Sequence, residues 1–382
     1  MVLSGRTTSF TMMLLMLVLL ATPSITTRGV AGAEARQASP TSLNCGPLAT
    51  PAPATPSVAA QPPVEPVAPP EDAVKMTVGY VPISIYAPLF VAKEKGYYAE
   101  QGLDVSLESF AGGGDLVALT ATGDLDAAAS GAGPAFWNAA DAGLPFSVVA
   151  PGHSEGSPVA TPLMISREAC ESGAITRVSD LRGKKVSVNA RGATEYWLGQ
   201  ALATDGLTID DIDLQTIPFP DAVVALASGA LDAAMVAEPV ATGAEQQGLA
   251  VRLLADFPVQ DVQPTVIVAN DKFIAEYPDA AQGFVTAYLK ACRDLAGPGF
   301  KDPTNLALIE RYTSVPATLV GAAVQPVYSV DGRIDIAGLS KLQTFFRERG
   351  QLEYDEDIDP ATLVDDRFVQ AALPELGPYE PS

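Results

Sequence analysis

Short runs of apolar residues alternate with stretches of helical spacing along the chain from about residue 76 onward. Runs of this length, bounded by glycine, proline and polar residues, predict buried strands. In the first segment we expect strands over 76–81, 103–110, 125–129 and 146–150, with helices over 87–101, from Asp115 onward and over 134–142. Such alternation predicts a mostly parallel, doubly wound α/β sheet.

A second segment repeats the pattern. Strands are predicted over 185–189, 214–219, 231–236 and 251–257, with helices over 194–204 and 221–228. The apolar run 264–269 is expected to return the chain to the first sheet, and 271–373 to form a helical tail. The chain would then cross twice between two lobes, near 152–162 and 257–265, and these crossings would form a hinge.

One phrase occurs in both segments. ATGDLDAA at 121–128 returns as ASGALDAA at 227–234, 106 residues later, which is far longer than the period of a solenoid. Each copy predicts a helix of small residues, a glycine C-cap, a strand and a turn. Because ligands of open α/β sheets bind at the carboxyl ends of the strands, two such lobes facing each other would form a clamp.

The N-terminal region predicts a targeting segment followed by a spacer. Arg6, an apolar run over 12–21 and small residues at 31–33 predict a signal peptide over 1–33, and hence a periplasmic or cell-surface protein. Residues 34–74 are rich in proline and alanine and are expected to form an extended, disordered linker. Lobe 1 would comprise 75–158 and 262–382, and lobe 2 would comprise 159–261.

Composition narrows the classes of partner. The chain has 382 residues, is 48% hydrophobic and carries a formal net charge of −22. This supplies enough apolar material for two lobes, while the negative surface would repel nucleic acid and anionic membranes. His153 is the only histidine, which excludes a histidine-rich metal site, and no motif indicates a cofactor.

The three cysteines show no zinc-binding spacing. Cys292 lies on an apolar stripe of a predicted helix and reads as a buried core thiol, although a Cys170–Cys292 disulfide stays open for an exported protein. Cys45 either carries a lipid anchor, despite an asparagine directly before it that fits a lipidation signal poorly, or is an unpaired cysteine of the linker.

Several motifs together resemble one family. They are GYVPISIYAPLFVA at 79–92, KGYYAEQGLDV at 95–105, the glycine turn at 112–114, both repeated phrases, SDLRGKKV at 179–186, and Glu238-Pro239. Over about residues 76–300 the chain resembles the periplasmic substrate-binding proteins of ABC importers for nitrate, sulfonate, taurine and thiamine-pyrimidine-type ligands. The resemblance implies a two-lobed type II periplasmic-binding-protein fold. It also implies a monomer that is not an enzyme, binds a small molecule between its lobes and delivers it to an ABC transporter permease.

The resemblance also implies where the ligand is held, because the family uses loops at strand ends and the N-termini of helices. Helix N-termini and an arginine suit an anionic group. Each candidate also has a purely structural interpretation: Asp115 and Thr194 as ordinary N-caps, Arg191 as the partner of Glu195, Tyr86 as a core residue. The candidate positions are Ser84, Tyr86, Gly113, Asp115, Ser130, Gly131, Arg191, Thr194, Glu195 and Glu238.

Aromatic residues near predicted strand ends favour a flat heteroaromatic ligand, such as an aminopyrimidine or a flavin-like vitamin precursor, which would stack on them. Glu238 could hydrogen-bond a ring amine of such a ligand. Arg191 and the helix N-termini keep sulfonate, taurine or nitrate as the alternative. The aromatic residues in question are Tyr80, Tyr86, Phe136, Trp137, Tyr196 and Trp197.

Enzyme interpretations fit less well. GHSEG at 152–156 matches the nucleophile elbow of hydrolases, but that fold requires a histidine after the serine, and the chain's one histidine precedes it. A pyrimidine-synthase-like enzyme of the same fold would carry a cysteine-rich motif that is absent here. The third class of function considered is a ligand sensor, which would lack an effector domain of its own. The aspartates at 355, 357 and 359 resemble a calcium loop, but Pro360 replaces the required glycine, so Asp359 is better interpreted as a helix N-cap.

Overall fold

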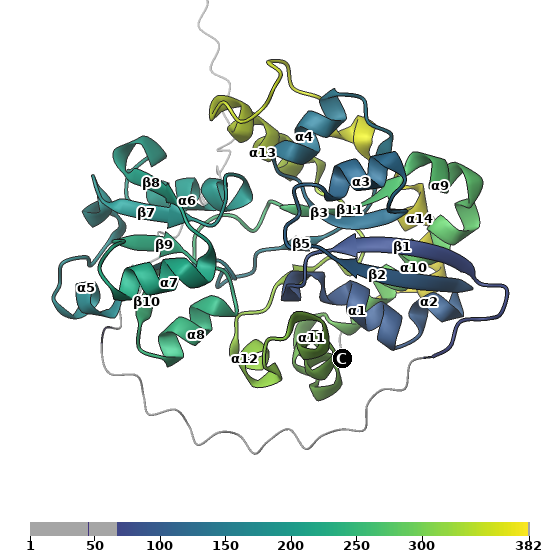
Figure 1. The fold of residues 1–382 in the computed structure, drawn as a ribbon, viewed down its shortest axis with the longest axis horizontal. Helices are drawn as coiled ribbons and strands as arrows, with labels where there is room; N and C mark the ends of the chain where they lie inside the picture. Colours follow the sequence, from purple (N-terminus) through teal and green to yellow (C-terminus); the bar gives the residue numbers. More distant parts are fainter. Residues whose placement is uncertain (1–44, 46–66, 381–382) are drawn as a thin grey trace, which may run out of the picture. The chain divides into compact units, whose positions relative to one another are not determined.

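Two five-stranded sheets form the framework of the protein (Figure 1). The structure, a computed structural model, describes Cys45 and residues 67–380. In the first sheet, with order β2-β1-β3-β11-β4, β1 runs parallel to β2 and β3, and β11 runs antiparallel to β3 and β4. Its strands are β1 (Val74–Tyr80), β2 (Leu103–Ser109), β3 (Ala127–Gly131), β4 (Phe146–Pro151) and β11 (Thr265–Asn270).

The second sheet has the order β10-β6-β9-β7-β8, with β7 parallel to β8 and β9 and with β6 antiparallel to β9 and β10. Each sheet therefore contains one reversed strand among four parallel strands. This agrees with the predicted doubly wound, mostly parallel α/β sheet. The strands are β6 (Leu163–Ser166), β7 (Lys185–Val188), β8 (Asp213–Thr216), β9 (Ala233–Met235) and β10 (Ala250–Leu254).

Helices cover the sheets, and two of them depart from the predicted bounds. The single helix expected over 87–101 is broken where Gly96 takes a φ of +79°, and α5 and α8 form where the sequence analysis predicted no helix. Phe219 begins α7 instead of ending β8, because Pro218 and Pro220 cannot donate to a ladder. The helices up to β11 are α1 (Ala87–Glu94), α2 (Tyr97–Glu100), α3 (Leu116–Thr122), α4 (Pro134–Asp141), α5 (Arg167–Glu171), α6 (Ala193–Ala203), α7 (Phe219–Ala227) and α8 (Val240–Gln246).

Where the chain crosses between the sheets, its backbone at Gly152 lies very close to β11. After β4 the chain passes through Gly152 into β5 (His153–Ser154), which pairs with β12 (Val327–Tyr328). A Cβ atom at Gly152 would lie 2.5 Å from the Thr265 carbonyl oxygen, so only glycine fits beside β11. The run at 264–269 forms most of β11 in the first sheet; the residues proposed as lobe boundaries stay a prediction.

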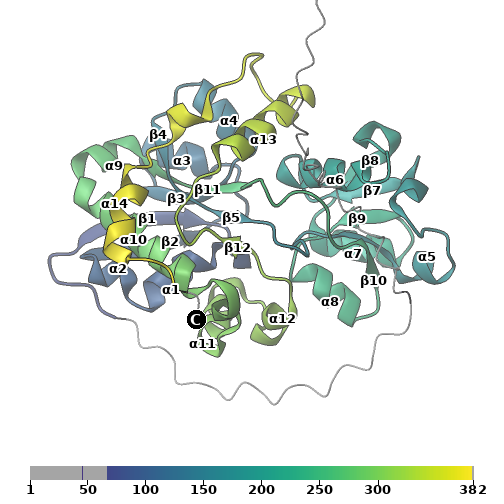
Figure 2. The same ribbon diagram turned by 180° about the vertical axis from the view of Figure 1, so that it is seen from behind.

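The C-terminal part is helical, and one of its helices contacts both lobes. Helix α13 touches α4 beside the first sheet and α6 beside the second, and lies between them in Figures 1 and 2. Leu342 and Phe346 of α13 belong to one apolar cluster with Trp137 and Trp197. The remaining helices are α9 (Asp271–Glu276), α10 (Pro278–Asp294), α11 (Pro303–Thr313), α12 (Ala317–Ala322), α13 (Ile336–Glu348) and α14 (Arg367–Leu376).

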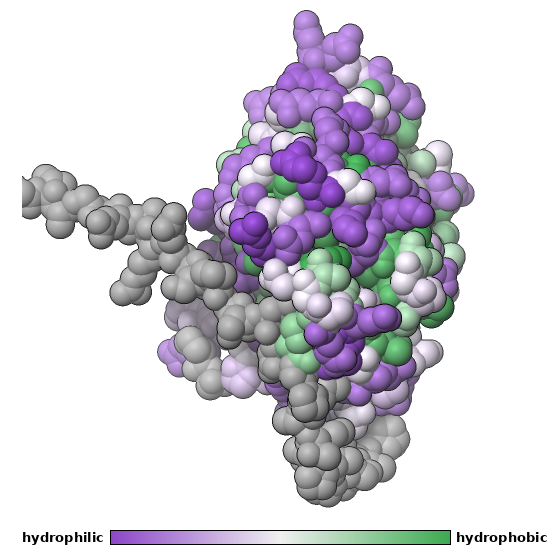
Figure 3. All heavy atoms as spheres, turned by 90° about the vertical axis from the view of Figure 1, so that its left-hand side faces the viewer, coloured by the Kyte–Doolittle hydropathy of each residue, from purple (hydrophilic) through white to green (hydrophobic). Residues whose placement is uncertain are grey.

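The two predicted N-terminal segments lie partly or wholly outside the described residues. The predicted signal peptide over 1–33 lies outside them, as does most of the predicted linker. In the part of the chain that the structure describes, no helix combines the length and the apolar character needed to cross a membrane. The end face of the second lobe in Figure 3 carries many hydrophilic side chains.

The cysteines pair differently from the predicted option. Cys45 and Cys170 form a disulfide, with Cα atoms 5.5 Å apart, and Cys292 is free. The Cys170–Cys292 option is therefore wrong, because Cys170 lies in α5 of the second lobe and Cys292 in α10 of the first. The same bond leaves no Cys45 thiol for a lipid anchor. Cys292 is fully buried, and its burial raises the pKa of its thiol to about 12, as expected for a core residue.

This pairing predicts a specific thiol count. Unreduced, denatured protein should expose one reactive thiol, that of Cys292, and reduction should raise the count to all three cysteines. The folded protein should expose none, because the free thiol is buried and protonated. Alkylation followed by mass spectrometry gives the count, and Cys292→Ser should abolish labelling without reductant. Three labelled cysteines in unreduced, denatured protein would contradict the disulfide.

Candidate functional site

The loops that follow β3 and β7 face each other at the boundary between the lobes. A Cβ atom placed on Gly192 would lie 3.8 Å from Cδ of Pro134. Pro134 begins α4 and Gly192 is the N-cap of α6, so the N-termini of two helices meet here. Because each helix N-terminus carries free N–H groups and a partial positive charge, the junction favours a negatively charged group.

Arg191 lies at this junction, and only the Nε of its guanidinium has a protein partner among the described residues. Its side chain is 47% exposed, and its Nε donates to Glu195 Oε2. Within the described chain no partner is present for its two Nη atoms. The predicted Arg191–Glu195 pair is thus present, yet it leaves free the Nη edge with which arginine binds carboxylates, sulfonates and phosphates.

Glu195 is fully buried in the first turn of α6 and receives several donors. Besides Arg191, Arg349 Nε donates to its Oε1 at 2.9 Å and Gln351 Nε2 donates to its Oε2 at 2.8 Å. A carboxylate with this many protein donors has little capacity left for a ligand. The geometry therefore gives Glu195 the role of holding Arg191.

A residue that sequence reasoning did not select lies at the carboxyl end of β7. The side chain of Asn189 makes no hydrogen bond to any described residue, and its Oδ1 is buried. Thr194 is half-buried and lies in the first turn of α6, three residues after Arg191. The position of Asn189 at the carboxyl end of the strand predicted over 185–189 was a usable signal, because that is where ligand contacts occur in this class of sheet.

On the first lobe, Ser84 and Tyr86 form the short 3-10 helix before α1. Both are buried; the Ser84 carbonyl accepts a hydrogen bond of 3.0 Å from the Tyr328 hydroxyl. The Tyr86 hydroxyl has no hydrogen-bond partner among the described residues, and burial raises its pKa. Tyr86 is thus packed in the core, as its structural interpretation predicts, while its polar atom stays available.

The other first-lobe candidates lie at two separate strand ends. Gly113 lies in the loop after β2, and Asp115 precedes α3 without making the expected N-cap bond, because its backbone is helical (φ −92°, ψ −10°) instead of extended. Ser130 and Gly131 end β3 beside the junction loop. The Ser130 hydroxyl is 1% exposed and donates to the Gly131 carbonyl at 3.2 Å.

Glu238 is fully engaged by protein donors. Its side chain is 4% exposed, and Arg252 Nη2 lies 2.6 Å from its Oε1. It also accepts from the Thr242 amide (3.1 Å), the Thr242 hydroxyl (3.0 Å) and the Val324 amide (3.2 Å). Glu238 is therefore a structural carboxylate that joins α8 to the segment after α12, and its burial and four protein donors leave it little capacity for a ring amine.

The expected aromatic wall is not formed by free ring faces. All six aromatic candidates are at most 8% exposed. Trp137 Nε1 donates to the Ala132 carbonyl at 3.1 Å, and Trp197 Nε1 donates to Glu155 Oε1 at 2.8 Å. These rings mainly pack the core, which removes the main argument for a stacked heteroaromatic ligand.

The motifs considered for catalysis or metal binding serve structural roles. His153 Nδ1 lies 2.8 Å from Thr265 Oγ1, and burial lowers the pKa of the imidazole to about 4. Asp359 accepts from the Ala361 amide at 3.0 Å with Pro360 following it, which confirms the N-cap interpretation. Among the described residues, no cluster of three or more histidine, cysteine or acidic side chains could hold a metal ion.

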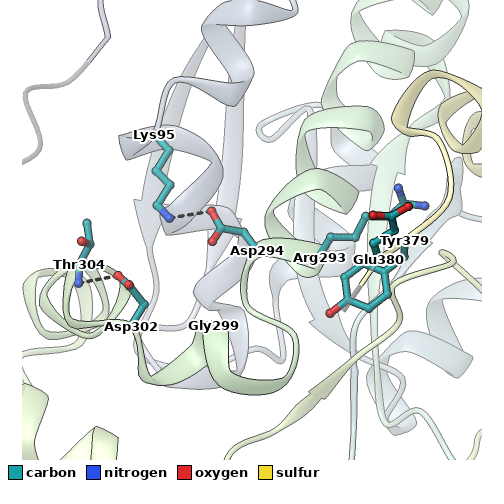
Figure 4. Close-up of a pocket in the computed structure, with 8 residues that line it drawn as sticks. All are labelled: Lys95, Arg293, Asp294, Gly299, Asp302, Thr304, Tyr379 and Glu380. Atoms are coloured by element: carbon teal, nitrogen blue, oxygen red, sulfur yellow. Dashed lines mark hydrogen bonds and ion pairs between the residues drawn. The ribbon is translucent and has the colours of Figure 1, made fainter. Parts of the chain in front are cut away.

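A pocket of about 670 Å³ lies elsewhere, at the C-terminal end of α10 (Figure 4). Its two cationic side chains are already engaged: Lys95 Nζ lies 2.7 Å from Asp294 Oδ2, and Arg293 donates to the carbonyls of Leu376 and Gly377. This pocket therefore lacks free recognition groups of the kind seen at Arg191.

Comparison with known proteins identifies the family. The sequence profile of the NMT1-like family matches residues 69–307, more than half of the chain. The chain belongs to the NMT1-like family. The curated relatives of this NMT1-like chain include the bicarbonate transport ATP-binding protein CmpC of Synechococcus elongatus, 29% identical over 265 residues, which cover 64% of this chain and 39% of CmpC. The riboflavin-binding protein RibY of Chloroflexus aurantiacus is 28% identical, over 65% of this chain and 70% of RibY.

Solved structures show the same fold. The periplasmic aliphatic sulphonate binding protein SsuA of Escherichia coli matches with a TM-score of 0.64 at 18% identity, over 76% of this chain and 92% of SsuA. The desulfurization enzyme DSZB matches with a TM-score of 0.59 at 19% identity, over 79% of this chain and all of DSZB. The predicted two-lobed type II periplasmic-binding-protein fold is thus confirmed for this NMT1-like protein, and the fold is one that binding proteins share with an enzyme. The chain spans about two fifths of the length of CmpC.

Proposed function

We propose that this protein is the exported solute-binding component of an ABC importer, which binds a small molecule between its lobes and delivers it to a permease. The observation that carries the proposal is the meeting of the loops after β3 and β7, one from each sheet. Ligand contacts to both loops would favour the closed arrangement of the lobes and report an occupied state to a permease. The names of SsuA and RibY, both binding proteins, fit this role, and CmpC is named as a protein of bicarbonate transport.

The ligand that the junction favours carries an anionic group. Two helix N-termini and the unengaged edge of Arg191 converge there, whereas the aromatic rings and Glu238 are committed to the core. A sulfonate, taurine, nitrate or bicarbonate would satisfy these donors. A flavin-like ligand is the second candidate, because RibY is named as a riboflavin-binding protein.

The exported state has support from the disulfide. Structural disulfides form and persist in oxidising compartments and are rare in the cytosol, and Cys45–Cys170 joins residues 125 positions apart. We propose that the protein is exported and functions as a monomer without a lipid on Cys45.

We also propose that the protein is not an enzyme, although DSZB shares its fold. The one histidine of the chain is engaged by Thr265, and the one free thiol is buried in α10, so neither can serve as base or nucleophile at the junction. Pyrimidine formation from pyridoxal phosphate and iron by purified protein would contradict this proposal.

The test is a binding screen of the full-length exported protein. Native mass spectrometry and thermal shift would be measured with bicarbonate, nitrate, ethanesulfonate, taurine, riboflavin and an aminopyrimidine. We expect stabilisation by an anion, since binding to the folded state alone raises its stability. No shift and no bound mass with any of these ligands would contradict the proposed binding function, and a shift with riboflavin or the pyrimidine alone would contradict the anionic class.

Arg191→Gln is expected to weaken anion binding by about 10- to 100-fold, because the variant loses the charge-assisted hydrogen bonds between the guanidinium and the anion. Stability should change little, because the Arg191 side chain is 47% exposed. Isothermal titration would measure the affinity. Arg182→Gln is the matched control, because Arg182 is also exposed on the second lobe and pairs with Asp211. Equal affinities for the two variants would remove Arg191 from the site.

A further inference from the structure

The segment directly after α13 turns sharply toward the junction. Arg349 is the C-cap of α13, and Gly350 takes a φ of +63°. The Gly350 amide donates to the Arg347 carbonyl at 2.8 Å, and the Gln351 amide donates to the Phe346 carbonyl at 2.8 Å. These two bonds form a Schellman motif, which requires a left-handed residue at this position. The motif fixes the direction in which the side chains on either side of Gly350 leave the turn.

Both side chains reach the first turn of α6. Arg349 Nε donates to Glu195 Oε1 at 2.9 Å, and Gln351 Nε2 donates to Glu195 Oε2 at 2.8 Å. Arg349 Nη1 also donates to Asp210 Oδ1 at 2.9 Å. Glu195 in turn holds the Nε of Arg191. A continuous chain of charge-assisted bonds therefore runs from the C-terminal segment to the junction arginine.

The same segment is attached to the first lobe. Two residues beyond Gln351, the Glu353 amide donates to Asn138 Oδ1 at 3.0 Å. Asn138 lies on α4, the helix that follows the junction loop of the first sheet. Within five residues, the chain thus holds both helices whose N-termini meet at the junction. Upstream, the Phe345 ring packs on Tyr196 with centroids 5.3 Å apart, which keeps α13 against α6.

We propose that Arg349–Glu353 is a clip that sets the spacing of the two junction loops and orients Arg191 for an anion. The proposal rests on the proposed function and deepens it: Arg349 and Gln351 are positioning residues that touch no ligand and act through Glu195. Because Glu195 engages Arg191 through Nε, it aims the Nη edge outward and removes rotamer freedom that a free arginine would lose on binding. The clip also biases the ligand-free protein toward the closed arrangement, which raises the fraction that is competent to bind.

The test compares two arginines of one helix end in the full-length protein. Arg349→Ala breaks the clip, whereas Arg347→Ala is the matched control, because Arg347 pairs with Asp357 in the loop that follows the same helix. Asn138→Ala loosens the clip on the first lobe and leaves Glu195 untouched, so it decides the outcome if Arg349→Ala does not fold. Arg349→Lys should restore part of the lost effect through its charge.

Two readouts are expected to move. Small-angle X-ray scattering of the ligand-free protein should give a larger radius of gyration for Arg349→Ala and Asn138→Ala than for wild type or Arg347→Ala. Affinity for ethanesulfonate and bicarbonate, used as probes, should fall about tenfold for Arg349→Ala. Wild-type scattering together with wild-type affinity in both clip variants would overturn the clip. If wild type binds neither probe but the clip variants expand, the clip stands and the anionic class fails.

Discussion

Replacing Glu238 with alanine is expected to lower the free energy of unfolding by about 3–5 kcal/mol, the cost of removing one partner of a buried ion pair. The sequence alone suggested that Glu238 contacts the ligand. The structure instead gives it a structural role, because Glu238 is 4% exposed and its main partner Arg252 only 14% exposed. Without Glu238, Arg252 Nη2 and the Val324 amide would lose their carboxylate acceptor in a place that water reaches poorly. Among the described residues, Arg252 would keep only Thr242 and the more exposed Glu245 as partners.

Urea unfolding at pH 7, followed by far-UV circular dichroism, would measure this loss. Glu245→Ala is the matched control, since Glu245 also pairs with Arg252 but is 28% exposed, and its loss should cost less than about 1 kcal/mol. The double variant Glu238→Ala with Arg252→Leu should recover part of the stability, because no unpaired charge then remains buried. Equal losses for Glu238→Ala and Glu245→Ala would show that the buried pair does not stabilise the fold.

Local patterns in the sequence were sufficient for the order and type of the elements. Most strands and helices of both sheets follow from apolar runs, glycine caps and the repeated phrase, because these signals act within a few residues, whereas the short helices α5 and α8 were not predicted. The errors have local causes as well. The break at Gly96 occurs inside a stretch of good helical spacing, and β8 ends early because two prolines flank Phe219.

The candidate site was predictable in its loops but not in its pairings. Arg191 and Glu195 lie four residues apart, so their ion pair could be weighed from the sequence. The partners that decide the role of each carboxylate are distant: Arg349 is 154 residues from Glu195, and Val324 is 86 residues from Glu238. The Cys45–Cys170 bond, across 125 residues, was missed for the same reason. Pairings of this kind depend on tertiary packing that no spacing rule encodes.

Acid is expected to destabilise the protein through its one histidine. Burial lowers the pKa of His153 from 6.5 to about 4, and Thr265 Oγ1 holds the ring at the lobe crossing. Between these two pH values the unfolded chain binds a proton that the folded protein does not, so the free energy of unfolding rises with pH. The stability that neutral His153 supplies is complete above pH 6.5 and falls by about 3 kcal/mol as the pH drops to 4.

Glu155, two residues further along the crossing, titrates in the opposite sense. Burial raises the pKa of its carboxyl, so the folded protein binds this proton more readily than the unfolded chain, and the stability that it supplies is lost as the pH rises. The variant His153→Gln isolates the histidine, because Glu155 and every other carboxyl contribute equally to both proteins. Urea unfolding of wild type and variant at pH 7, 6, 5 and 4 should show the stability difference between them shifting by about 3 kcal/mol in favour of the variant toward acid. Parallel stability curves would mean that His153 titrates normally, and that the crossing admits a charged imidazole beside Thr265.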